Sequence, residues 1–109
     1  MAKHEFGIMQ LAPKKGERYD EYEPQKYNCI ALDDDTVVKI APLWDRIDFY
    51  WHSPDLPAKG IAYTGITLIP PTSIQSCLAG IEDASEFRKL KNLLKKALSE
   101  NKWVIHFGL

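Results

Sequence analysis

The sequence has little cysteine, little glycine and no long apolar run. Its two cysteines, Cys29 and Cys77, lie far apart among 109 residues. Secreted domains of this size usually need several disulfides because their cores are small, so we expect free thiols and a cytoplasmic protein. The chain has neither a CxxC spacing nor a Cys/His cluster, which excludes the common zinc-binding and thioredoxin-type patterns.

Membrane and export signals are also lacking. No apolar run approaches the roughly 20 residues that a membrane-spanning helix needs, so we predict no membrane association. The first ten residues, MAKHEFGIMQ, place His and Glu where a secretory signal needs an apolar stretch. Export by that route is therefore not expected.

The local motifs of several enzyme classes are missing too. The six glycines are scattered, and no phosphate-binding loop, nucleophile elbow or HExxH helix occurs. The acidic run 33–35 fits a turn and a helix start better than a metal loop, which needs alternating ligands. We predict no cofactor and no metal, name no catalytic residue, and lean toward a protein that is not an enzyme. Dispersed active sites leave that question open.

What is present indicates one globular domain over residues 1–109. Hydrophobic residues make up 45% and charged residues 27% of the chain, and the net charge is −1. An apolar content this high with little net charge is typical of a folded chain. The length is enough for one core and not for two.

Apolar periodicity predicts strands at 5–11, 28–32, 48–53, 60–69 and 103–109. It predicts helices over 36–47, from residue 72 onward, and over 83–101, the last two starting with capping boxes (Thr72/Gln75 and Asp83/Glu86). The β-branched run at 36–41 also fits a hairpin strand, and the sequence does not decide between the two. Segments 13–27 and 53–60 read as loops.

This order predicts an α+β fold. If the N-terminal strand is set aside and the two adjacent helices are merged, the elements follow the ferredoxin-like order βαββαβ. We therefore predict a two-layer sandwich with helices on one face of the sheet. The N-terminal strand is then an addition at an edge, and the last helix is split in two.

The period-2 alternation of strands predicts which side chains point away from the helices. It directs Ile66 and Leu68, and Trp103, Ile105 and Phe107, toward the helices. Tyrosine is enriched at interfaces because its ring buries area while its hydroxyl finds a partner, so the opposite face is a candidate binding surface. Its predicted residues are Tyr27, Tyr50, His52, Tyr63, Thr67 and His106, with Cys29 beside them. Alternatively, the N-terminal strand and segment 13–27 fold over this face as a lid.

Two further features bear on partners. The ferredoxin-like order puts His52 and His106 on opposite edges of the sheet, roughly 14 Å apart, so they and His4 cannot share a metal. The last predicted helix is basic on its outer side, but the whole chain has a pI of about 6.3. That balance disfavours nucleic acid, and solvated lysines or an acidic partner explain the helix better.

Two hypotheses of function follow from these observations. The first is a small, non-enzymatic interaction or regulatory module, of the immunity or dimerising type. It would bind a protein partner or a second copy of itself through the aromatic sheet face. The alternative is a small-ligand-binding protein or enzyme, whose pocket lies between segment 13–27 and the sheet, near His52 and Tyr63.

Overall fold

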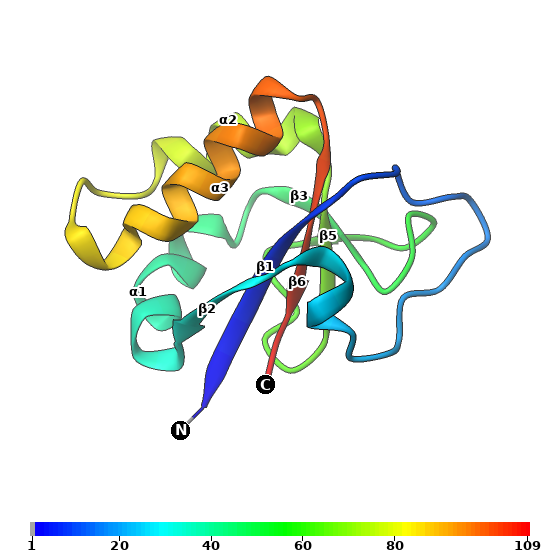
Figure 1. The fold of residues 1–109 in the computed structure, drawn as a ribbon, viewed down its shortest axis with the longest axis horizontal. Coiled ribbons are helices and arrows are strands. Elements are labelled where there is room, and N and C mark those ends of the chain that lie inside the picture. Colours follow the sequence, from blue (N-terminus) through cyan, green and yellow to red (C-terminus); the bar gives the residue numbers. More distant parts are fainter. Residues whose placement is uncertain (1) are drawn as a thin grey trace.

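The computed structural model describes residues 2–109 and shows an α+β fold with a six-stranded antiparallel sheet. Figure 1 shows the helices on one side of this sheet and the long loop after the first strand on the other. Within the described residues the strands are β1 (Lys3–Met9), β2 (Ile30–Asp33), β3 (Asp48–Trp51), β4 (Pro57–Lys59), β5 (Ile66–Ile69) and β6 (Trp103–Phe107). The helices are α1 (Asp34–Trp44), α2 (Pro71–Ala79) and α3 (Arg88–Ser99), and 3-10 turns form at Pro24–Tyr27 and Ser85–Phe87.

The strand order is β2-β1-β6-β5-β3-β4, so the ferredoxin-like order is not confirmed. The predicted edge position of the N-terminal strand is wrong, because β1 pairs with β2 on one side and β6 on the other. Phe6 and Met9 of β1 are both buried, on opposite faces of the sheet. A strand that is covered on both faces belongs in the middle of a sheet rather than at its rim.

Residues 36–41, which fit either a helix or a strand, are helical. Val37, Ile40 and Trp44 form the buried stripe of α1. Pro42 lies in the last turn of this helix, where a missing N–H disturbs few further hydrogen bonds, and the helix ends two residues later. α1 therefore keeps an apolar face toward the sheet despite its proline.

The last helix is split as predicted, but the two capping boxes are wrong. α2 starts at Pro71, whose ring presets the helical φ, and α3 starts at Arg88 after a 3-10 turn. No side-chain cap forms at the start of any of the three helices in residues 2–109. Glu86 pairs instead with Lys39 of α1 at 3.0 Å.

The loops differ from prediction in two places. The short strand β4 lies within the predicted 53–60 loop and pairs with β3. The predicted strand at 60–69 begins only at Ile66, because residues before it turn, with Gly65 N–H donating to the carbonyl of Ala62. Segment 13–27 is a loop apart from its short 3-10 turn.

Both faces of the sheet carry a core. The helices cover one face, called here the helix face, where the side chains of Phe6, Phe49 and Val104 are buried. Residues 10–29, called here the covering segment, pack on the opposite face, called here the outer face. Buried side chains of the outer face are Met9, Ile66, Leu68, Ile105 and Phe107, and Tyr19, Tyr27 and Cys29 of the covering segment pack against them.

This arrangement corrects the predicted facing of two strands. The side chains that lie on the outer face, not toward the helices, are Ile66, Leu68, Trp103, Ile105 and Phe107. In WVIHF both alternating sets contain apolar residues, so periodicity alone does not distinguish the faces once both are buried.

None of the helices in residues 2–109 has the length and apolarity to cross a membrane.

Candidate functional site

The six residues predicted as one binding surface are divided between two faces. Tyr27 and Tyr50 lie on the outer face, where they pack in its core. Thr67 and His106 are wholly buried and hydrogen-bonded to each other on the helix face. Tyr63 also lies on that side, with its ring 5.1 Å from that of His4. Of the predicted set, only His52 borders a surface cavity described below.

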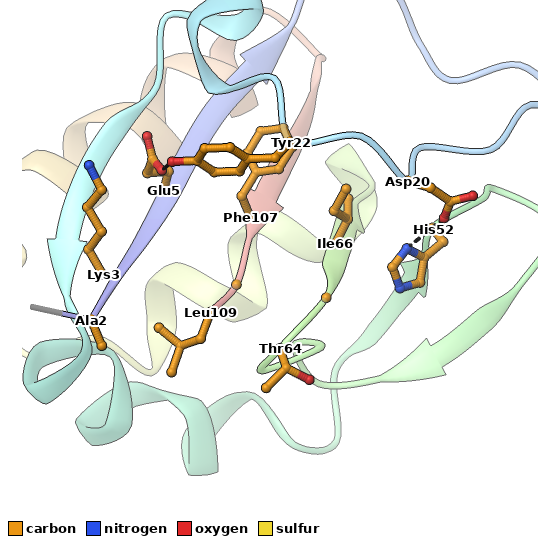
Figure 2. Close-up of a pocket in the computed structure, with 12 residues that line it drawn as sticks. Ala2, Lys3, Glu5, Asp20, Tyr22, His52, Thr64, Ile66, Phe107 and Leu109 are labelled. Atoms are coloured by element: carbon orange, nitrogen blue, oxygen red, sulfur yellow. Dashed lines mark hydrogen bonds and ion pairs between the residues drawn. The ribbon is translucent and has the colours of Figure 1, made fainter.

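A cavity of about 550 Å³ opens at one end of the outer face. Figure 2 shows its lining side chains, which come from the start of β1, the covering segment, the turn before β5 and the end of β6. This volume lies within the usual range for small-molecule sites. Apolar side chains of Ile66, Phe107 and Leu109 line it together with polar side chains of Lys3, Glu5, Asp20, Tyr22, His52 and Thr64.

His52 is held in place from three sides. Its φ is 63°, in the left-handed region that non-glycine residues rarely adopt. Its N–H donates to the carbonyl of Ile66 at 3.0 Å, and its own carbonyl accepts from the N–H of Tyr19 at 2.6 Å. A Cβ atom at Gly65 would lie 2.8 Å from His52 Nε2, so the ring occupies space that only glycine leaves free.

Asp20 lies beside the His52 ring. Its Oδ1 is 3.0 Å from His52 Nδ1, but this contact lacks hydrogen-bond geometry. Within residues 2–109, Nδ1 is buried and has no other partner. Arg18 donates to Asp20 at 2.8 Å, and this hydrogen bond is the main cause of the lowered pKa of the Asp20 carboxyl. The imidazole therefore faces an ionised carboxylate.

The opposite wall joins the covering segment to β1. The Tyr22 hydroxyl donates to the Glu5 carboxylate, which raises the pKa of that phenol. The Tyr22 ring stands edge-on to Phe107, with centroids 5.6 Å apart. The covering segment thus supplies both Asp20 and Tyr22, and the cavity exists only while this segment is docked.

A second polar cluster is buried on the helix face beneath β1 and β6. His4 Nε2 donates to Asp34 Oδ1 at 2.9 Å, because an ionised carboxylate can only accept. His4 Nδ1 lies 2.8 Å from His106 Nε2, so the two rings share one hydrogen bond. His106 Nδ1 lies 3.2 Å from the Thr67 hydroxyl oxygen, and Thr67 Oγ1 accepts from Ala62 N–H at 2.7 Å. Burial, and then His4, lower the pKa of His106 to about 3, so its ring is neutral.

The histidines do not form a metal centre. β3 and β6 are separated only by β5, so the predicted placement of their histidines at opposite edges is wrong. His52 and His106 are nevertheless apart, because one borders the outer-face cavity and the other is buried on the helix face. In the described residues no three His, Cys, Asp or Glu side chains are grouped to hold a metal ion.

The two thiols are free and unreactive in their surroundings. Cys29 is half-buried in the outer-face core, and Cys77 is buried on the inner side of α2. Burial raises the pKa of each thiol to about 12. A thiolate nucleophile needs the opposite shift, so neither thiol contributes to a candidate site.

Comparison with models of protein families, with curated proteins and with solved structures finds no significant match. Function is therefore inferred from the site alone. The sequence predicted a pocket between segment 13–27 and the sheet near His52 and Tyr63; His52 lines the cavity and Tyr63 does not. Asp20, Glu5 and Phe107 were missed as lining residues. The alternation of charge and tyrosine along segment 13–27 was a signal for Asp20, whereas Glu5 and Phe107 lie in strands outside that segment.

Proposed function

We propose that the protein binds a small molecule in the cavity between the covering segment and the outer face of the sheet. The observation that carries this proposal is the His52 site at the cavity. A strained backbone, a glycine that makes room for the ring and an ionised carboxylate together hold one imidazole beside an apolar floor. Strained residues cluster at binding and catalytic sites, and small-ligand pockets combine an apolar lining with a few fixed polar groups.

The outer face supports this proposal better than it supports a flat partner surface. Phe107, Tyr50 and Trp103 of the sheet share the outer-face core with Tyr19 and Tyr27 of the covering segment. A partner that used this face would have to displace that segment. A small molecule needs only the cavity that the docked segment leaves open.

The test uses amide NMR spectra of the whole chain with toluene, phenol and benzoate as millimolar probes. We expect at least one probe to shift the amide resonances of Gly65, Ile66 and Gly108, which line the cavity. Thr64→Trp should block this effect by filling the mouth. Thr72→Trp, at an exposed position on α2, is the matched control and should leave it unchanged. If none of the probes shifts these resonances in the unaltered protein, the proposal fails.

A protein partner, or a second copy of the chain, is the alternative proposal. Exposed side chains of Tyr22 (60%) and Leu109 (45%) belong to the cavity lining, and such apolar side chains suit an interface. Light scattering over a range of concentrations tests self-association. A rising mass that Tyr22→Ala abolishes would favour this alternative over the small-molecule site.

A further inference from the structure

We infer that the cavity takes a neutral cyclic compound bearing a hydroxyl group, a ring alcohol or a phenol, whose O–H donates to Nε2 of His52. This inference rests on the proposed function and specifies the chemistry of its ligand. It follows from the direction in which the imidazole is polarised, from the charges around it and from the apolar floor.

The position of the proton on the His52 imidazole decides which group the ligand must offer. A neutral histidine carries one ring proton, and an adjacent carboxylate favours that proton on the nearer nitrogen. Asp20 Oδ1 lies 3.0 Å from Nδ1 without hydrogen-bond geometry, so in the neutral ring the negative charge nearby favours the proton on Nδ1 and leaves the lone pair on Nε2. Figure 2 shows the other ring nitrogen on the side of the ring away from Asp20. In its neutral form His52 is thus a hydrogen-bond acceptor and calls for a donor on the ligand.

The charged groups around the cavity limit the charge of the ligand. Glu5, Asp20 and Lys3 line the cavity, so an anionic ligand meets two carboxylates of its own sign against one ammonium group. A cationic ligand finds these carboxylates already engaged: Arg18 pairs with Asp20, and the Tyr22 hydroxyl donates to Glu5. A neutral donor satisfies Nε2 without disturbing either pair.

The apolar residues that line the cavity determine the hydrocarbon part of the ligand. Phe107 and Ile66 are nearly fully buried residues that line the cavity, with Leu109 beside them. Apolar side chains of this kind favour a compact hydrocarbon ring, which buries area without losing much rotational freedom. A ring that lies on this floor can direct a hydroxyl substituent toward His52.

The experiment compares dissociation constants for phenol, cyclohexanol, toluene and benzoate, measured by NMR titration of the Gly65 and Ile66 amides. Phenol and cyclohexanol should bind about tenfold more tightly than toluene, the equilibrium effect of one net hydrogen bond. Benzoate should bind most weakly. Phenol binding should also shift the ¹⁵N resonance of His52 Nε2 and leave that of Nδ1 in its protonated position.

The variants separate this inference from the proposed function. His52→Asn keeps a residue type that tolerates the positive φ, and it should abolish the preference for phenol while toluene still binds. Asp20→Asn should weaken phenol binding, whereas Glu21→Gln, an exposed neighbour outside the cavity lining, should not. Equal binding of phenol and toluene, or tightest binding of benzoate, overturns the ligand class and leaves the cavity function standing. Binding by none of the four compounds overturns both.

Discussion

The hydrogen-bonded pair of His4 and His106 limits the protonation of the buried polar cluster. Both rings are fully buried, and only one proton fits between the two facing nitrogens. Asp34 accepts a hydrogen bond from His4, and the hydroxyl of Thr67 is hydrogen-bonded to His106. A positive charge on His106 would face the ring of His4 and the hydroxyl of Thr67 rather than solvent, so the arrangement requires that His106 stay neutral.

This neutrality predicts a pH dependence of stability. The folded-state pKa of His106 is about 3, below the value near 6.5 of an unfolded histidine, so the unfolded chain takes up the proton first. Stability should be complete above about pH 6.5 and fall as the pH decreases toward 3, by up to about 1.4 kcal/mol per pH unit. Urea unfolding at several pH values measures this slope.

The assignment to His106 is checked in the same samples by NMR. Its ring resonances should not titrate between pH 7 and pH 4.5 in the folded protein. Titration of His106 in that interval, or a stability that does not change across it, contradicts the prediction.

At the scale of elements, α3 offers the cleanest pair of neighbouring positions. Leu94 is fully buried, whereas Lys95 is exposed. Leu94→Ala should reduce the free energy of unfolding by about 2–5 kcal/mol, because it leaves a cavity in a packed core. Lys95→Ala should change it by no more than about 0.5 kcal/mol. Urea titration of both variants makes the comparison, and equal effects would show that the buried face of α3 is wrongly assigned.

β1 and the covering segment meet most closely at Gly7. A Cβ atom there would lie 2.7 Å from Cys29 Sγ and 2.7 Å from Tyr27 Cβ. Gly7→Ala should therefore destabilise the protein by about 1–3 kcal/mol, since either the strand or the covering segment must shift. The measurement is thermal or urea unfolding, with the resonances of Tyr27 as a local probe.

Gly80→Ala is the matched control for this prediction. Gly80 follows α2 with a φ of −87°, and a Cβ there would meet its nearest neighbour at an ordinary 3.5 Å. This variant should be neutral or slightly stabilising, because alanine reduces the freedom of the unfolded chain. A Gly7→Ala variant that is as stable as Gly80→Ala would show that the covering segment is not closely docked.

Elements were more predictable from the sequence than their arrangement. The buried stripe of α3 repeats at helical spacing, so a helix there could be predicted directly, whereas the β-branched residues of α1 fitted a helix or a strand. The sheet face to which each strand side chain points could not be predicted, because Val104 and Ile105 are equally apolar and both sheet faces are buried. The place of β1 depends on pairing with β6, a contact between distant segments that no local pattern encodes. His52 and segment 13–27 could be singled out from the sequence. Only the fold shows that Asp20 of this segment and Gly65 lie beside His52.

At the scale of the whole molecule, the two thiols test the predicted compartment. Both cysteines are free, and burial raises their pKa values to about 12. We expect two alkylated cysteines by mass spectrometry after denaturation without reductant. Alkylation of the folded protein should be slow at Cys29 and negligible at Cys77. A missing pair of adducts would reveal a disulfide and contradict the prediction of a cytoplasmic protein.

The central position of β1 has a consequence for biosynthesis. His4 and its partner His106 are separated by 102 positions, and β6 lies between β1 and β5 in the sheet. A ribosome therefore releases β1, β2 and the three helices before the strand that unites the two halves of the sheet has emerged. Until then β1 has an open edge and an apolar surface on both faces, the state in which nascent chains depend most on chaperones. Loop closure over such a distance also makes folding slow, so the sheet completes only after translation has passed residue 107.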